Sequence, residues 1–159
     1  MYYHLNIENQ IKKIMSKFNE YELETADSSD ELVDIIHGQI YKQLLESEDG
    51  VLFKHKKAIS LIMNSDGISS FKKSKLTIWP VWININELPL SKRFSIDNNI
   101  LAGLSIGEEK PNTDHFFNPI VIKLKKLEMG FDLSIQNVTR ETKCFLIAAI
   151  SINQQKLRF

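Results

Sequence analysis

Apolar residues recur every three or four positions near the start of the chain, the spacing of one face of an α-helix. Asn6 directly precedes this stretch, and Asn is a residue type that caps helix N-termini with its side-chain oxygen. Glu8 stands in the first turn, where a negative charge interacts favourably with the helix dipole. The sequence therefore predicts a helix that begins after Asn6 and buries a face made of Ile7, Ile11, Ile14, Met15 and Phe18.

A second helical pattern covers residues 30–46 and contains Gly38 near its middle. Glycine weakens a helix interior because its backbone loses more conformational freedom on folding. Gly38 therefore either weakens this helix or divides it into two. The preceding residues, 20–34, are rich in Asp and Glu, and we interpret them as a solvated acidic connector that ends in a helix cap.

The apolar pattern then changes to runs of strand length. Three runs, AISLIMN (58–64), KLTIWPVWINI (75–85) and NNILAGLSIG (98–107), are rich in Ile and separated by polar residues and Gly. Such runs in succession predict an antiparallel meander. Pro80 has no N–H for the ladder, so we expect the second strand to be bulged there or to lie partly at an edge. The NELP tetrapeptide (86–89) is expected to turn the chain.

One more helix and one more strand are predicted after the meander. Pro119 belongs in the first turns of this helix, after a cap at Thr113 or directly after a cap at Asn118. Gly130 ends it. Residues 143–153 (KCFLIAAISIN) are apolar on both sides and predict a central strand buried on both faces. The apolar face of the helix consists of Phe116, Phe117, Ile120, Val121, Leu124 and Leu127.

Length, charge and cysteine content narrow the class of protein. The chain has 159 residues, of which 43% are hydrophobic and 25% charged, enough for one globular core. Twenty basic residues balance twenty acidic ones, so any nucleic-acid site must be local. A single cysteine, Cys144, excludes an internal disulfide and indicates a reducing compartment. The longest apolar run near the C-terminus is too short to span a bilayer, which predicts an intracellular protein without a membrane association.

Asp66 is the residue whose position raises a question of chemistry. An Asp-Gly pair between two strands usually forms a tight hairpin turn. Here about ten residues separate the predicted strands, far more than a two-residue turn requires. Asp66 is therefore predicted to end a strand, where a carboxylate can hold a divalent cation. The loop that follows contains a basic cluster, and its members are candidate phosphate contacts or, alternatively, a solvated face: Lys72, Lys73 and Lys75.

Three stretches carry a resemblance to a known family. They are ISLIMNSDGISSFKKSKLTIWPVWININELP, NNILAGLSIGEEKPN and FFNPIVIKL, and in this order they resemble the transposase domain of CACTA-type (En/Spm-like) DNA transposons, especially the invertebrate relatives. The upstream DIIHGQIYKQL is similar to the segment that precedes this domain. The resemblance covers residues 30–153 and implies an α/β, ribonuclease-H-like fold, here incomplete: a three-strand antiparallel meander, a helix and a central parallel strand, preceded by two N-terminal helices. The order of the predicted elements agrees with this fold.

The resemblance also implies a division of the chain. Residues 1–50 would form an N-terminal helical segment, and residues 51–159 would form the N-terminal portion of a ribonuclease-H-like transposase domain. Because the family's third acid lies beyond residue 159, we expect the sequence to be a truncated copy. The family's role in DNA transposition further implies DNA as a partner and a nuclear localisation.

The family's chemistry is metal-dependent DNA strand cleavage and transfer, in which three acidic residues hold two Mg²⁺ or Mn²⁺ ions. By resemblance, Asp66 matches the first acid and is the expected metal ligand. Asn153 stands at the position of the second acid, and the family's following Pro and Ala are absent. A neutral amide compensates two nearby dications less well than a carboxylate. We therefore expect productive metal binding and cleavage by this chain alone to be lost.

Two other readings remain open at the level of sequence. The first is a protein-interaction or self-association module, because an incomplete sheet would leave apolar surface uncovered around Phe145, Leu146 and Ile147. The second is a metal-dependent hydrolase of another kind that uses Asp66 with Glu87. We interpret Glu87 otherwise as a turn or surface residue.

Overall fold

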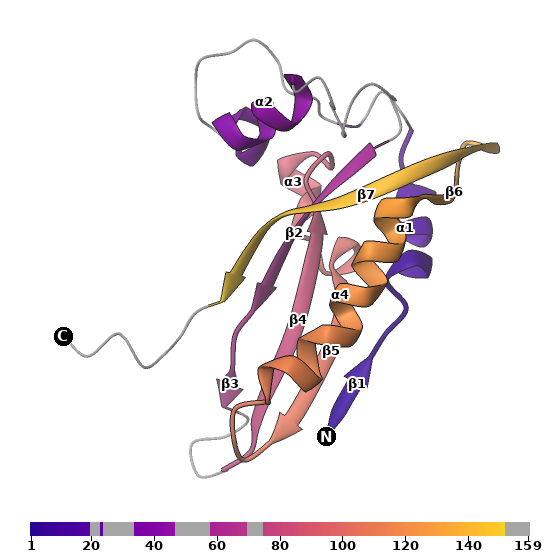
Figure 1. Cartoon of the computed structure of the whole chain (residues 1–159). Coiled ribbons are helices and arrows are strands. Elements are labelled where there is room, and N and C mark those ends of the chain that lie inside the picture. Colours follow the sequence, from indigo (N-terminus) through magenta and orange to yellow (C-terminus); the bar gives the residue numbers. More distant parts are fainter. Residues whose placement is uncertain (20–22, 24–33, 47–57, 70–74, 152–159) are drawn as a thin grey trace.

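The computed structural model describes residues 1–19, 23, 34–46, 58–69 and 75–151. These parts of the chain contain both helices and strands (Figure 1). The elements in chain order are β1 (Tyr2–His4), α1 (Ile7–Met15), the 3₁₀ helix η2 (Ile35–His37), α2 (Gln39–Glu46), β2 (Ala58–Ser65), β3 (Ile68–Ser69), β4 (Thr77–Ile85), α3 (Leu90–Arg93), the 3₁₀ helix η3 (Ile96–Asn98), β5 (Ile100–Gly107), α4 (Thr113–Met129), β6 (Phe131–Ile135) and β7 (Val138–Ser151).

The strands form one mixed sheet in the order β1-β5-β4-β2-β7-β6, and β3 pairs with β4 outside this path. β2, β4 and β5 are antiparallel neighbours, which confirms the predicted meander. β7 follows α4 in the chain and lies parallel to β2, with Ile59 opposite Cys144 and Ser65 opposite Ser151. The α/β class, the meander and the parallel strand that follows a helix are therefore present.

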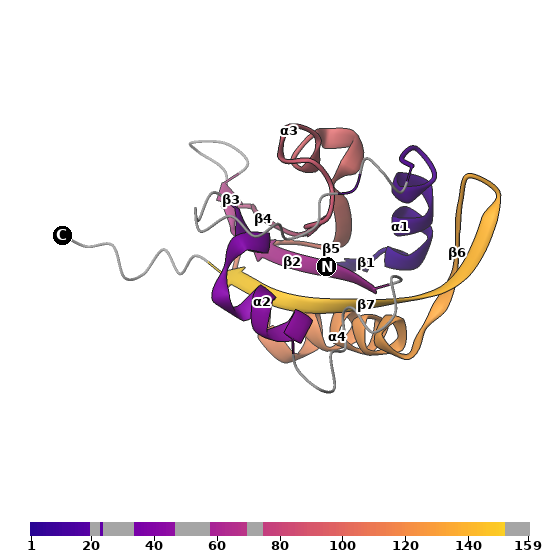
Figure 2. The ribbon, with the colours of Figure 1, turned by 90° about the horizontal axis from the view of Figure 1, so that it is seen from above.

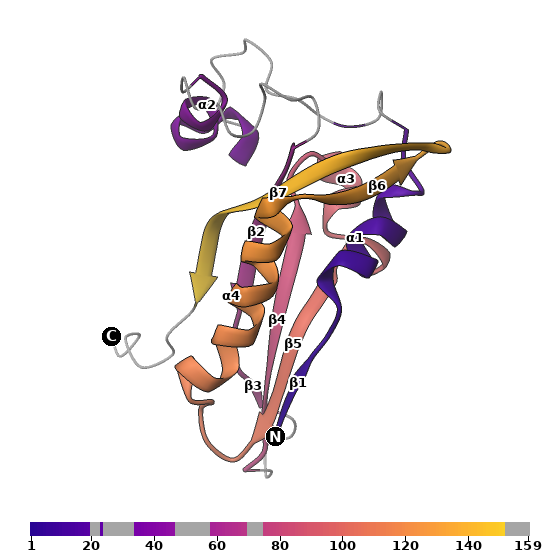
Figure 3. The ribbon, with the colours of Figure 1, turned by 45° about the vertical axis from the view of Figure 1, so that its right-hand side comes forward.

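Helices lie on both sides of this sheet. Figures 1 and 3 show α4 running along one face, and Figure 2 shows α3 on the opposite side of the sheet from α4. The apolar face of α1 is buried as predicted, and Asn6 caps this helix by accepting a hydrogen bond from the backbone N–H of Asn9 at 2.9 Å. A single core joins α1, α4 and the strands, and its members include Ile11, Leu61, Ile83, Ile100, Phe116, Ile120, Leu133 and Cys144.

Several predicted elements differ in detail from the structure. Gly38 divides the second helical pattern, because η2 ends there and α2 begins at the next residue. The predicted irregularity near Pro80 is a register shift between Val81 and Trp82. The α4 cap is neither Thr113 nor Asn118 but Asn112, which accepts a hydrogen bond from the backbone of His115.

The last strand differs most from its prediction. β7 is a long strand whose first part pairs with β6 and whose second part, from Lys143 onward, pairs with β2. Among the described residues, no strand pairs with the other edge of this second part. The prediction of a central strand buried on both faces was therefore wrong for this part: Cys144 is buried, residues 145–148 are half-buried, and Ile150 is half-exposed.

Three strands were not predicted at all. The short β3 pairs with β4 in the region that was expected to be a loop. β1 adds three residues to the edge of the sheet beside β5, and β6 forms a hairpin with β7. Gln136 and Asn137 connect β6 to β7, and both have positive φ angles (50° and 64°), as the tight two-residue hairpin turn requires. Asn tolerates this conformation better than most residues, so Asn137 was the available signal for the turn.

Candidate functional site

Asp66 directly follows the last residue of β2 and is half-buried. Its carboxylate accepts a hydrogen bond from the backbone N–H of Gly67 (Oδ1 to N, 2.8 Å). The preceding Ser65 is buried, and its hydroxyl has no hydrogen-bond partner within the part of the chain that the structure describes. Asp66 thus follows β2, as predicted, but β3 resumes the antiparallel pairing with β4 at Ile68, so a short interruption of the ladder and not the predicted long loop directly follows this residue.

Gly67 fixes the chain beside Asp66 against the indole ring of Trp79. A Cβ atom added to Gly67 would lie 2.6 Å from Cζ2 of Trp79, a distance at which atoms overlap. Trp79 also has the ammonium group of Lys110 over its ring, 5.6 Å from the ring centroid, a favourable cation–π arrangement. The Asp-Gly pair therefore serves close packing as well as placing a carboxylate.

The other predicted site residues fall at or near the limits of the described chain. Asn153, Lys72 and Lys73 lie outside the described residues, whereas Lys75 is described and exposed. The described β7 ends at Ser151, which pairs with Ser65, so the two parallel strands β2 and β7 end at the same edge of the sheet. This pairing places Ser65, which precedes Asp66, next to Ser151, which is the last described residue and stands two positions before Asn153 in the sequence.

The described donors at this edge do not suit a pair of divalent cations. Asp66 supplies one carboxylate, and position 153, outside the described residues, is a neutral amide in the sequence. Among the described residues, no group of three His, Cys, Asp or Glu side chains could hold a metal ion. Two dications need more anionic oxygen ligands than one carboxylate provides.

Glu87 lies far from Asp66, near the other end of β2. Its carboxylate contacts Ser60, and Asp66 lies six positions further along the extended chain, which corresponds to roughly 20 Å. The structure therefore does not bring Asp66 and Glu87 together. Glu87 was interpreted as a turn or surface residue. It does lie in the turn after β4, but it is 5% exposed and is therefore not a surface residue.

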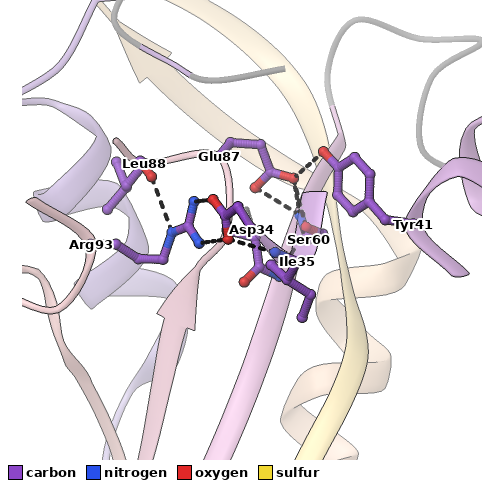
Figure 4. A network of polar contacts seen from close by, with 8 residues as sticks. Asp34, Ile35, Tyr41, Ser60, Glu87, Leu88 and Arg93 are labelled. Carbon is purple, nitrogen blue, oxygen red and sulfur yellow. Dashed lines mark hydrogen bonds and ion pairs between the residues drawn. The ribbon is translucent and has the colours of Figure 1, made fainter. Parts of the chain in front are cut away.

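Glu87 is the acceptor at the centre of a buried polar network (Figure 4). Oε1 accepts hydrogen bonds from the Ser60 hydroxyl (2.7 Å), the Ser60 backbone N–H (2.9 Å) and the Tyr41 hydroxyl (3.1 Å). The Ser60 hydroxyl in turn accepts a hydrogen bond from the side-chain amide of Asn86. Burial raises the pKa of Glu87 to about 6 against the lowering effect of the Ser60 and Tyr41 hydrogen bonds.

A second buried contact lies beside this network. Arg93, 1% exposed, donates from both terminal nitrogens to the two carboxylate oxygens of Asp34 at 2.6 Å, and its Nε donates to the carbonyl of Leu88 (Figure 4). Burial tends to raise the pKa of Asp34, but the Arg93 hydrogen bond and charge, with the backbone N–H of Ile35, hold it below its usual value. Asp34 thus caps η2 and forms an ion pair, and is not part of a solvated connector.

Signals for these two contacts in the sequence were weak. Asp34, Glu87 and Arg93 are charged residues, and residues of these types are mostly exposed. Nothing in local spacing shows that Asp34 meets a residue 59 positions away. The Leu88-Pro89 pair after Glu87 was the available hint, because apolar residues around an acid indicate that the turn packs against the core.

A scan against models of protein families, a search of curated proteins and a search of solved structures each gave no match. The resemblance to CACTA-type transposases therefore depends on the motifs in the sequence alone. In the parts of the chain that the structure describes, no helix is long and apolar enough to cross a membrane.

Proposed function

We propose that this chain is a derivative of a CACTA-type transposase domain that has lost DNA strand cleavage and acts in the nucleus as a DNA-associated protein. The supporting motifs run from the Asp-Gly pair to the Lys-Pro-Asn that precedes α4. Lys72, Lys73 and Lys75 are the proposed phosphate contacts, and Lys75 is exposed. Strand order is also consistent with a ribonuclease-H-like arrangement, which we propose as the finer description of the fold.

One observation carries this proposal: β2 and β7 are parallel neighbours, and Asp66 follows the end of β2. The carboxyl ends of parallel neighbours share one edge, so residues after both strands can face a common substrate. Position 153 comes two residues after Ser151. The loss of cleavage follows from Asn153, because an amide brings no negative charge to the paired dications that the family uses.

Restoring the missing charge tests this assignment. Asn153→Asp should create an Mn²⁺ response that the wild type lacks, because two carboxylates at one edge bind a dication better than one. At an ion concentration ten times the dissociation constant, the stabilisation is about 1.4 kcal/mol, or about 4 °C in Tm for a chain of this size. Differential scanning fluorimetry with and without Mn²⁺ measures the shift.

Two controls make the result specific to Asp66. Asp66→Ala introduced into the Asn153→Asp variant should abolish the Mn²⁺ shift. Asn137→Asp, at the exposed tip of the β6–β7 hairpin, should produce none. An equal Tm shift in Asn153→Asp and Asn137→Asp would refute the proposal that positions 66 and 153 share one edge of the sheet. Mn²⁺-dependent nicking of supercoiled DNA by the wild type that is lost in Asp66→Ala would refute the loss of cleavage.

The second candidate function is self-association, and the free edge of β7 favours it. From Cys144 to Ser151 this strand carries no charge and no Pro, and in the described chain it pairs on one side only. Natural edge strands usually carry such residues to prevent pairing with another chain. An uncharged edge suits antiparallel pairing with a second copy of the same strand.

A further inference from the structure

Asp66 and Gly67 point to opposite faces of the sheet. β2 and β3 pair with β4 in one continuous register, which places Asp66 opposite Pro80 and Gly67 opposite Trp79. A Cβ atom at Gly67 would be directed at the indole ring of Trp79, so these two residues share a face. Because successive residues of a strand point to alternate faces, Asp66 points to the other face.

The face that contains Trp79 is the one that α4 covers. Trp79 pairs with Ser105 of β5, and Gly103, two residues earlier in β5, points to the same face. A Cβ atom at Gly103 would lie 2.9 Å from Cδ1 of Ile120 in α4. Asp66 therefore points to the face on which α3 lies (Figure 2).

Apolar side chains surround Asp66 on this second face, and several of them are open to solvent. Ile68, two residues after Asp66, is 57% exposed. Ile150 of β7 pairs with Asn64, two residues before Asp66, and is 50% exposed. Further described residues of this face, on β1, β4 and β5, are Tyr3, Ile78, Pro80, Trp82, Leu104 and Ile106. None of these described neighbours is positively charged, so Asp66 is a negative charge on an apolar surface of the kind that marks an interaction site.

The segment that follows β7 has the chemistry to cover this surface. β7 ends at Ser151, which pairs with Ser65, the residue before Asp66. Residues 152–159, outside the described part of the chain, have the sequence INQQKLRF, with three apolar residues, two basic residues and no acidic one. Eight extended residues span up to about 26 Å, and the distance from β7 across β2 to β4 is about 10 Å. The segment is therefore long enough to reach Asp66 and the apolar side chains around it.

We propose that residues 152–159 dock on this face of the sheet and place Lys156 or Arg158 against the Asp66 carboxylate. The cation compensates the carboxylate, and the three apolar residues of the segment cover side chains that are otherwise exposed to water. A second copy of the same face would instead bring another carboxylate and no cation, so charge complementarity favours the segment. The docked cation takes the place that a divalent ion would occupy beside Asp66, and docking closes this edge of the sheet to other ligands.

Trypsin digestion of the full chain, without DNA or metal ions, tests the docking. Trypsin cleaves after Lys156 and Arg158, and a docked segment is cleaved only while it is transiently open. The wild type should therefore lose residues 157–159 about tenfold more slowly than a synthetic peptide of residues 150–159. Mass spectrometry of the C-terminal products gives the initial rates. Because the assay contains no DNA, a failure of docking and a failure of the proposed DNA association are separate results.

Two variants with matched controls assign the docking to this face. Asp66→Asn should raise the cleavage rate about threefold, the effect of losing one partly exposed ion pair, whereas Asp132→Asn, at an exposed position of β6, should not change it. Ile68→Ser should also raise the rate, because it removes exposed apolar surface that the segment covers. Ile122→Ser, at an exposed position of α4, is its control and should leave the rate unchanged.

Three outcomes would overturn the proposal. They are cleavage of the wild type at the rate of the peptide, the same rate in Asp66→Asn as in the wild type, and protection that increases with protein concentration, which would assign the docked segment to a second copy. Should Asp66→Asn not fold, as judged by circular dichroism, the salt dependence of the wild type decides the question. Sodium chloride screens the ion pair and should raise the cleavage rate relative to that of the peptide, whereas a constant ratio refutes the pair.

Discussion

At the scale of the residue, two carboxylates differ in how far the structure encloses them. Asp66, the metal ligand expected by resemblance, is half-buried and accepts a hydrogen bond from the next backbone N–H. Glu87 belongs to a turn motif, yet it is nearly inaccessible and accepts hydrogen bonds from Ser60 and Tyr41. Burial changes the pKa of a carboxylate, and the free-energy cost of keeping it charged, far more than its sequence neighbours do.

The contact between Gly67 and Trp79 leads to a prediction about stability. Gly67→Ala should destabilise the protein by about 1–3 kcal/mol, because the new methyl group would overlap the indole ring and force β3 or Trp79 to move. Urea unfolding followed by circular dichroism measures this loss. Gly107→Ala is the matched control, since its nearest atoms are at least 3.8 Å from the added Cβ. A loss of the same size in both variants would show that the indole contact is unimportant.

At the scale of the element, β7 shows how one strand serves two partners. Its first part forms a hairpin with β6, and its second part extends the meander beside β2. The apolar run from Phe145 onward predicted the strand, but only the pairing shows that one of its edges has no partner strand among the described residues. α4 illustrates a similar limit. The sequence left two starting points open for this helix, after Thr113 or after Asn118, and only the structure shows that it begins at Thr113 and continues through Pro119.

If β7 mediates self-association, a charge on its exposed end should weaken the dimer. Ile150→Lys adds a charge to the pairing strand, the kind of residue that prevents natural edge strands from pairing, and should cost about 1 kcal/mol, or about fivefold in Kd. Size-exclusion chromatography with light scattering over a range of concentrations measures this change. Ile122→Lys on α4, at a similarly exposed apolar residue, should have no effect. A wild type that stays monomeric at about 100 μM, where weak dimers form, would remove this candidate.

At the scale of the whole molecule, the first helix and the sheet depend on one core. Ile7, Ile11 and Ile14 are buried together with residues of β2, β4 and β5, and Leu5 of the β1–α1 connection donates its backbone N–H to Ala102 of β5. A core that contains residues from both ends of the described chain predicts one cooperative unfolding transition.

Ile11→Ala tests whether α1 stabilises the sheet. Ile11 is completely buried, so its truncation should destabilise the protein by about 2–5 kcal/mol. Trp79 and Trp82 lie in β4, and their fluorescence should report the same shifted urea midpoint as far-UV circular dichroism. Ile40→Ala, at a largely exposed position of α2, should change stability by no more than about 0.5 kcal/mol. An unchanged tryptophan midpoint in Ile11→Ala would mean that α1 and the sheet unfold separately.

The sequence by itself determined the elements with strong periodicity: the capped helix after Asn6, the three strands of the meander, the long helix before Gly130 and the apolar strand around Cys144. These depend on local spacing and on interactions within a few residues, which the chain order contains. Only the tertiary structure decided that Glu87 and Arg93 are buried, that Asp34 pairs across 59 positions, and that β7 has a free edge among the described residues. Burial and long-range pairing depend on which distant segments meet, and no local pattern records that.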